Sequence, residues 1–325
     1  MKDQFNPKPW ARNPHLQSIF ASLRIRTLGR NPMTEAARTV IIDGGDGVRL
    51  LGYHSPRYND SKKGMILLVH GWEGSADSTY ILHTGRYLHA AGFDIMRLNL
   101  RDHGASHHLN SGLFHGALID ETWSAVSHIA ADIKGMPLCI VGFSLGGNFA
   151  LRIALKQSEH PLNNLRHVIA VSPLLDPYTT TRALDNGFPL YKYYFLKKWK
   201  SSLKKKQAFF PHLYDFDEIL DAKSLMELTD LVIRRYSAFH DYRDYFRRYT
   251  LLGDVFSDLS MPVTIFTAMD DPMIPVTDFF GLKGNNCLEL SIQPRGGHCG
   301  FLDPFPFGCW YEKKIHDICS RYENF

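Results

Sequence analysis

The chain has 325 residues, of which 44% are hydrophobic and 22% are charged. These values are close to globular averages, and a chain of this length can bury roughly three quarters of its unfolded surface, so a disordered protein, a collagen and a small disulfide scaffold are excluded. The net charge is +4, but residues 192–206 contain seven lysines and no acid, so the basicity is local. A nucleic-acid-binding protein needs a basic face over the whole domain, and the sequence does not favour one.

Two further classes of protein are excluded by short-range patterns. The longest apolar runs, such as residues 65–69, are far shorter than the roughly 18 to 20 residues of a membrane span. The first residues contain no apolar segment typical of a secretory signal, so we expect a cytoplasmic protein. The five cysteines are odd in number and show no C-x-x-C spacing, which predicts five reduced thiols.

From about Arg38 onward, short β-branched runs alternate with helical patterns, which is typical of a mostly parallel sheet covered by helices. The predicted strands are residues 38–42, 48–54, 65–70, 94–99, 138–143, 167–171, 263–267 and 288–292. The first two flank the glycine-rich turn 43–47 and are expected to be antiparallel. Helices are predicted over residues 79–91, 117–133, 148–157 and 310–321.

About ninety residues separate the sixth predicted strand from the seventh, far more than an ordinary connection needs. We interpret them as a helical cap over the carboxyl edge of the sheet, whose second half, residues 221–249, has a helical pattern. The alternative is a surface decoration with no role in substrate binding. The expected organisation is an N-terminal extension packing on the core (1–37), a core made of 38–176 and 256–325, and an inserted cap (177–255).

The strongest local motif is Gly142-Phe143-Ser144-Leu145-Gly146, which follows an apolar run and precedes a run of helix formers. Glycines two residues on either side of a serine allow a sharp strand-to-helix turn that lifts the hydroxyl above the sheet edge, as in a nucleophile elbow. The motif predicts that Ser144 is a catalytic nucleophile. The plain alternative is a glycine-rich turn with an idle serine.

A serine nucleophile needs a base, and the base needs a third group that orients it. His298 lies in a glycine-rich loop after the last predicted strand and is the predicted base. Asp270 and Asp271 follow the seventh strand; we prefer Asp271, because the Asp-Pro turn aims its carboxylate into the site, while Asp270 would brace the loop. Asp176 is a third choice.

An oxyanion hole needs two amide donors, one from the residue after the nucleophile and one from the loop after the third strand. Leu145 and Trp72 occupy these positions, so their amides are the predicted donors. Glu73 is expected to brace the following helix and is given no chemical role.

These motifs together resemble the YheT-like branch of the α/β-hydrolase superfamily. The matching segments are residues 9–17 (PWARNPHLQ), 70–75 (HGWEGS), 99–101 (NLR), 141–148 (VGFSLGGN), 270–272 (DDP) and 296–298 (GGH). The resemblance implies an α/β-hydrolase fold, with about eight mostly parallel strands and a helical cap after the sixth, and hydrolysis of carboxylic esters. The chain departs from the family at residues 102–106 (DHGAS), where relatives often have Arg-Gly-Cys-Ser-Gly.

Three features allow two interpretations each. His103, His107, His108 and His115 could suggest a metal, but no regular ligand spacing accompanies them, so we expect a loop that lines one pocket wall. Aromatic residues recur at helical steps between residues 236 and 249 and favour a packed helix face over an acyl-binding wall. The lysine-rich stretch 191–206 could contact anionic lipids or substrates, although a solvated helix face is favoured.

The sequence therefore predicts a cytoplasmic serine hydrolase that cleaves carboxylic esters through an acyl-enzyme, with Ser144, His298 and Asp271 as its triad. We expect no cofactor, no metal and no nucleic-acid partner. The substrate would be a small-molecule or lipid ester, and peripheral contact with a membrane is an open alternative. An acyltransferase would use the same residues, and a catalytically inactive binding module would not need all three.

Overall fold

The computed structural model describes residues 4–57 and 63–323 and contains one eight-stranded sheet in the order β1-β2-β4-β3-β5-β6-β7-β8. The strands are β1 (Arg38–Asp43), β2 (Arg49–Ser55), β3 (Met65–Val69), β4 (Asp94–Asn99), β5 (Leu138–Phe143), β6 (Leu165–Val171), β7 (Val263–Ala268) and β8 (Leu288–Gln293). β2 runs antiparallel to both β1 and β4, and the remaining neighbours are parallel. The eight predicted strands and the mostly parallel sheet are confirmed.

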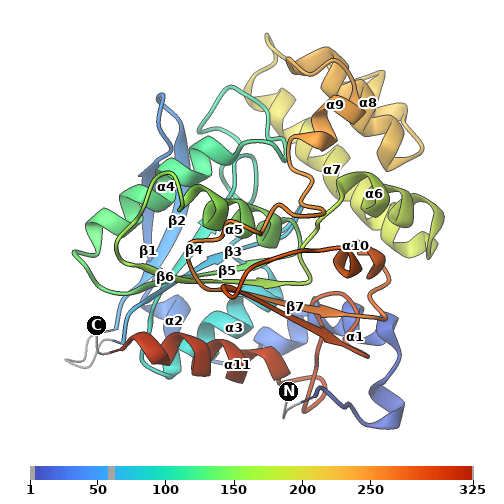
Figure 1. Ribbon diagram of the computed structural model, residues 1–325. Helices are drawn as coiled ribbons and strands as arrows, with labels where there is room; N and C mark the ends of the chain where they lie inside the picture. The colour runs from blue at the N-terminus through green and yellow to red at the C-terminus, as the bar shows by residue number, and fades with distance from the viewer. Residues whose placement is uncertain (1–3, 58–62, 324–325) are drawn as a thin grey trace.

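Helices cover both faces of this sheet (Figure 1). α4 (Ile119–Asp132) and α5 (Leu145–Lys156) lie on one face, while α3 (Thr79–Ala90) and α11 (Trp310–Cys319) lie on the other. Side chains alternate along β3, so Leu67 and Val69 enter the core with α4 and α5, and Ile66 and Leu68 enter the core with α3 and α11. Burial on both faces explains the continuous apolar runs of the central strands.

The four predicted helices are present, but α5 begins at Leu145 rather than at residue 148. Gly146 and Gly147 are poor helix formers, so the sequence pattern predicts that the helix begins after them. They are nevertheless helical because they pack closely on their neighbours: a side chain at Gly147 would lie 2.9 Å from Pro173. Tertiary contact therefore overrides the intrinsic preference of these two residues.

Four helices are inserted between β6 and β7, at the upper side of Figure 1. They are α6 (Pro177–Asn186), α7 (Pro189–Phe209), α8 (Leu225–Tyr236) and α9 (Tyr242–Arg247). The helical insertion after the sixth strand is thus confirmed, while its exact domain limits stay a prediction. The pattern over 221–249 is two helices, because residues 237–241 interrupt it and the Asp241 side chain accepts hydrogen bonds from the first amides of α9.

The chain before β1 forms short helices, namely η1 (Pro9–Ala11), α1 (Pro14–Ala21), η2 (Arg24–Thr27) and α2 (Pro32–Glu35). The other short elements are η3 (Ile219–Asp221), α10 (Thr277–Phe280) and η4 (Ser320–Tyr322). All five cysteines are free. Within residues 4–57 and 63–323, no helix is both long enough and apolar enough to cross a membrane.

Candidate active site

Ser144 occupies the sharp turn between β5 and α5 with a backbone φ of 54° and ψ of −118°. A positive φ is strained for a residue with a side chain and persists only where the surroundings enforce it. Three hydrogen bonds do so here: the Ser144 amide donates to the Val171 carbonyl at 3.0 Å, and the Ser144 carbonyl accepts the amides of Asn148 and Leu174 at 3.1 and 3.2 Å. The serine side chain is only partly buried, so it stands at an accessible edge.

The two glycines of the motif are needed because backbone approaches backbone around the turn. A side chain on Gly142 would overlap the carbonyl of Gly146, and one on Gly146 would overlap the carbonyls of Val69 and His70. The helix can therefore start directly behind the strand only when both positions lack a Cβ. The Gly142 requirement is local to the motif, whereas the Gly146 requirement comes from the neighbouring strand β3.

His298 lies in the loop after β8, and its Nδ1 is 2.8 Å from Oδ2 of Asp271 in the loop after β7. The Asp271 carboxylate is fully buried, and its other oxygen accepts the amides of Met273 and Ile274 at 2.8 and 3.0 Å. Burial of the ring opposes protonation, but the charge of Asp271 and the nearby Cys299 thiol outweigh it, so the pKa of His298 is raised well above 6.5. The pair thus holds an imidazole in one orientation with enhanced basicity.

The other two candidate acids lie elsewhere. Asp270 accepts the amide of Gly297 at 2.9 Å through one oxygen, and its second oxygen is buried without a partner among the described residues. Asp176 begins α6, where it accepts the amide of Tyr178 at 2.9 Å. Of the three carboxylates, Asp271 is the one within hydrogen-bonding distance of His298 in the described part of the chain.

The N-terminal segment supports the His298 loop, a contact that sequence reasoning missed. The Ser18 hydroxyl accepts the His298 amide at 2.8 Å, and Gln17 accepts the Leu302 amide at 2.7 Å while donating to the Ala11 carbonyl at 2.7 Å. Gln17 is completely buried. The segment Asn13–Ser18 (NPHLQS) stands out in the sequence, but its neighbouring residues do not indicate a partner about 280 residues away.

The His298 loop also reaches the carboxyl end of β6, next to the nucleophile. The Cys299 amide donates to the Ser172 hydroxyl at 3.1 Å, and the Cys299 thiol lies 3.7 Å from the Val171 carbonyl. The same Val171 carbonyl accepts the Ser144 amide. The Val171 carbonyl therefore contacts both Cys299, which follows His298, and the predicted nucleophile Ser144.

The loop after β3 lies against Ser144. A Cβ on Gly71 would be 3.1 Å from Cβ of Ser144, and the Gly71 amide donates to the Tyr80 hydroxyl at 2.9 Å. Trp72 follows directly in this loop, and its ring stacks on Phe195 of α7 at a centroid distance of 5.2 Å. Leu145 is the first residue of α5, where amides have no acceptor within the helix. Both predicted amide donors are thus in segments adjoining the serine.

Two buried histidines stiffen this loop in their neutral form. His70 accepts the Leu100 amide on Nε2 at 3.2 Å, so its proton is on Nδ1, 2.8 Å from the Gly71 carbonyl. His103 accepts the Glu73 amide on Nε2 at 3.2 Å. Burial lowers the pKa of His70 to about 3 and that of His103 to about 4. Both imidazole rings are therefore uncharged at neutral pH.

The remaining members of the predicted histidine loop face different partners. His107 is 2.8 Å from the Ser202 hydroxyl of α7, the His108 ring is near Phe209, and the His115 ring is near Phe239. The loop therefore lies under the inserted helices. Whether it lines the substrate pocket stays a prediction.

Lys206 is an exception to the solvated face that the sequence favoured for the lysine stretch, because Lys197, Lys198, Lys204 and Lys205 are exposed. Its side chain is 1% exposed and forms an ion pair of 2.7 Å with Asp102. Two carbonyls, those of Asn110 and Gly112, accept its other protons at 2.7 and 2.8 Å. The periodicity placed Lys206 among the other lysines, but its partner comes from a loop about a hundred residues earlier, and a buried ammonium is tolerable once every proton has an acceptor.

The predicted packing of the aromatic residues between 236 and 249 matches their surroundings. Tyr245, Phe246 and Tyr249 are buried in the core that contains α4 and α5, and the Tyr245 hydroxyl accepts the Gly116 amide at 2.7 Å. Tyr236 packs on Tyr214 and Phe216 within the inserted helices. These side chains attach the insertion to the sheet.

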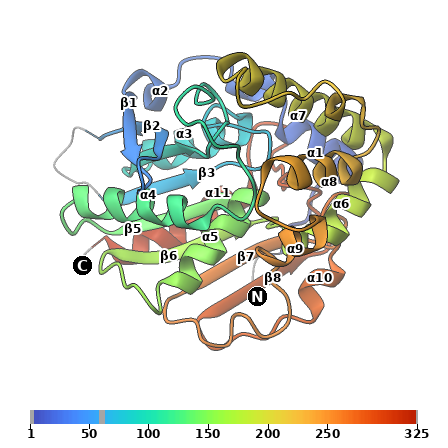
Figure 2. The same cartoon turned by 90° about the horizontal axis from the view of Figure 1, so that it is seen from above.

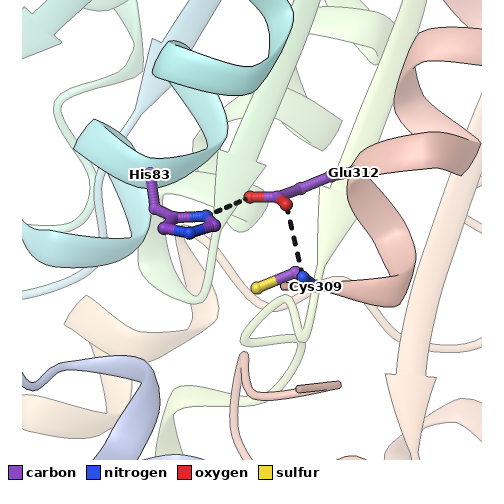
Figure 3. Close-up of side chains that lie close together, drawn as sticks. All are labelled: His83, Cys309 and Glu312. Atoms are coloured by element: carbon purple, nitrogen blue, oxygen red, sulfur yellow. Dashed lines mark hydrogen bonds and ion pairs between the residues drawn. The ribbon is translucent and has the colours of Figure 1, made fainter. Parts of the chain in front are cut away.

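His83, Cys309 and Glu312 bring three possible metal ligands within 4.8 Å of one another, as Figure 3 shows. Their ligand atoms are already engaged. One Glu312 oxygen lies 2.7 Å from His83 Nδ1, and the other accepts the Cys309 amide at 3.2 Å. The Arg26 guanidinium donates to the Cys309 sulfur at 2.9 Å, and its positive charge disfavours a cation there. We assign this cluster to the attachment of the N-terminal segment and α3 to α11.

The sheet order and the elbow define the α/β-hydrolase class. The chain belongs to the alpha/beta hydrolase family, whose family model matches residues 66–307. It is similar over 98% of its length to the Escherichia coli (strain K12) protein named "Putative esterase YheT", at 22% identity and covering 94% of that protein. These matches confirm the predicted resemblance to the YheT-like branch.

Two other similar proteins were found. Phospholipase ABHD3 of Mus musculus is 26% identical over 78% of this chain and 62% of its own length. The solved structure of the Pyrococcus furiosus esterase Pf2001 has a TM-score of 0.54 at 15% identity, covering 89% of this chain and 91% of that chain. The structural match supports the fold, and the family supports hydrolase activity.

Proposed function

We propose that the protein is a serine hydrolase that cleaves carboxylic esters through an acyl-enzyme. The observation that carries the proposal is the contact between Nδ1 of His298 and the buried carboxylate of Asp271. An imidazole held in this way presents Nε2 as a base, and a loop contact through Val171 brings it toward the strained turn at Ser144. The His298–Asp271 pair differs from the similar His83–Glu312 pair because its loop shares the Val171 carbonyl with Ser144.

In the proposed reaction, the Ser144 hydroxyl attacks the ester carbonyl while His298 accepts its proton. His298 then returns that proton to the leaving alcohol, which leaves an acyl group on Ser144. A water molecule, deprotonated by His298, releases the acid and restores the serine. Asp271 keeps the proton of His298 on Nδ1 and stabilises the imidazolium in both steps.

The amides of Trp72 and Leu145 are the proposed donors to the oxyanion. Both belong to segments that adjoin Ser144, and neither donor depends on its own side chain. Such a donor typically contributes about 3 kcal/mol in the transition state. The neutral His70 and His103 rings brace the Trp72 loop, so that the amide does not have to reorient during the reaction.

The names of the relatives, an esterase and a phospholipase, support a carboxylic ester as the substrate class. The mechanism above needs no metal or cofactor. The inserted helices pack on Trp72 through Phe195 and Trp199, which places them beside the proposed oxyanion site, where they can shape the acyl pocket.

A Ser144→Ala variant tests the proposal. We expect loss of labelling by a fluorophosphonate probe and a fall in kcat of about 10⁶-fold on a short-chain ester, because the triad acts as a unit. Ser201→Ala, at an exposed position of α7, is the matched control and should retain labelling and turnover. Labelling of Ser144→Ala at the wild-type level would contradict the assignment.

A panel of esters with graded acyl chains, assayed with and without an alcohol acceptor, then separates hydrolysis from acyl transfer. Hydrolysis predicts free acid as the main product under both conditions. Formation of a new ester faster than free acid would instead identify an acyltransferase, which uses the same acyl-enzyme.

A further inference from the structure

The solvent-facing side of α7 is unusual in its chemistry. The helix has 21 residues and is about 31 Å long at 1.5 Å per residue. Exposed residues recur at three- and four-residue steps along it, from Leu190 through Lys197 and Lys204 to Phe209. The opposite side is buried through Leu196 and Leu203. One continuous stripe of α7 therefore faces solvent over the whole helix.

This stripe combines positive charge with large apolar side chains. Its exposed lysines are Lys197, Lys198, Lys204 and Lys205, and residues 186–214 contain no aspartate or glutamate. Near the start of the helix, Leu190 is 50% exposed and Tyr193 is 65% exposed. Single exposed apolar side chains are common, but several gathered on one surface mark a site that contacts a protein or a membrane.

The N-terminal segment extends the same surface. His15 Nδ1 is 2.9 Å from the Tyr191 hydroxyl, and the His15 ring lies 4.8 Å from that of Phe188, so α1 adjoins the start of α7 (Figure 2). Residues 4–34 also contain no acid, and Trp10 and Leu16 are 60% and 39% exposed. Two segments remote in sequence thus adjoin each other, and both carry exposed apolar side chains and no acid.

We propose that this surface, formed by residues 8–16 and 188–209, docks on an anionic lipid bilayer. Lysines attract anionic headgroups, while tyrosine, tryptophan and leucine side chains enter the boundary between headgroups and acyl chains. A nucleic acid fits the surface less well, because leucine side chains such as Leu16 and Leu190 cannot stack on bases as aromatic rings do. Neither segment contains an acid of its own that would repel an anionic surface.

The position of the surface relates it to the proposed active site. Ser18 of α1 holds the His298 amide, and Tyr191 of α7 contacts His15 of the same helix. The junction of α1 and α7 is therefore next to the catalytic loop, and docking there would bring lipid esters to it. This last step rests on the proposed function, whereas the docking itself does not.

Co-sedimentation with vesicles tests the proposal. We expect the protein to bind phosphatidylcholine vesicles containing phosphatidylglycerol, to bind pure phosphatidylcholine vesicles much more weakly, and to dissociate at high salt. The double variant Lys197→Gln/Lys204→Gln should bind the anionic vesicles at least roughly tenfold more weakly. The matched control, Lys134→Gln/Lys283→Gln, removes two exposed lysines outside this surface and should bind as the wild type does.

Two further variants separate the alternatives. Leu190→Ser/Tyr193→Ser keeps every charge and should also lose vesicle binding; wild-type binding by this variant, with competition by heparin, would indicate a general polyanion surface and overturn the proposal. Equal binding by Lys197→Gln/Lys204→Gln and the wild type would overturn it as well. Ser144→Ala should bind vesicles normally, so that a failure of the catalytic assignment is distinguishable from a failure of docking. Circular dichroism melting verifies that each variant folds.

Discussion

The neighbouring residues Asp270 and Asp271 in the loop after β7 have different partners. Substituting each in turn therefore distinguishes a carboxylate that orients His298 from one that supports the loop. Because Asp271 raises the pKa of His298 above 6.5, and because the base must be neutral to accept a proton, kcat/KM should rise with pH around a midpoint above 6.5. Asp271→Asn should shift this midpoint to lower pH and reduce kcat by about 10⁴-fold. Asp270→Asn, the control, should keep the wild-type midpoint. Identical pH profiles for the wild type and Asp271→Asn would contradict the proposed role of Asp271.

Glu73 follows the proposed oxyanion residue and is held with a φ of 55°. Burial, together with the charge of Asp102, raises its pKa to about 8 from 4.5, despite the opposing influence of Lys198 and Lys205. The folded protein therefore binds a proton that the unfolded chain releases between pH 4.5 and 8, so the stability that this carboxyl contributes is lost as pH rises through that window. Between pH 5 and pH 8 the melting temperature should fall with rising pH, and it should fall less steeply in Glu73→Gln than in the wild type. A melting temperature that falls equally with pH in both proteins would be inconsistent with a protonated Glu73.

The helix α7 is attached to the core by the ion pair between Lys206 and Asp102. Replacing Lys206 by Met leaves Asp102 buried without its counter-charge, and breaking such a pair costs about 3 kcal/mol of unfolding free energy. The exposed Lys204→Met variant on the same helix is the control and should change the free energy by less than about 0.5 kcal/mol. Urea denaturation measures both. Addition of Asp102→Asn to Lys206→Met should recover part of the loss, and strict additivity would show that the two side chains do not stabilise each other.

The whole molecule is closed by contacts between the two ends of the chain. Gln17 joins the Ala11 carbonyl to the Leu302 amide, and Phe5 is buried with Phe301 in the core of α3 and α11. Gln17→Leu leaves two buried backbone groups without partners, which should cost about 2 kcal/mol and lower the melting temperature by a few degrees. It should also lower kcat, because Leu302 belongs to the loop that contains His298. Wild-type melting and turnover in Gln17→Leu would show that this junction is dispensable.

The sequence by itself indicated the eight strands, the four helices that cover the sheet and the turn at Ser144, because each leaves a pattern in neighbouring residues. Buried parallel strands appear as continuous apolar runs, and the turn at Ser144 needs glycines at 142 and 146 wherever it occurs. The candidate acids were also readable, since Asp270 and Asp271 follow β7 and Asp176 follows β6. The start of α5 was predicted late because Gly146 and Gly147 are helical only through tertiary packing.

Only the tertiary structure decided which groups meet. It gave His298 the Asp271 carboxylate as partner and left Asp270 to the Gly297 amide, whereas the Asp-Pro turn in the sequence favoured Asp271 without excluding its neighbour. It buried Lys206 among exposed lysines of the same helix, and it placed Ser18 under the His298 loop 280 residues away. Local periodicity reports which side of an element is apolar, but the partner of a polar group is set by how distant segments pack, and that information is spread over the whole chain.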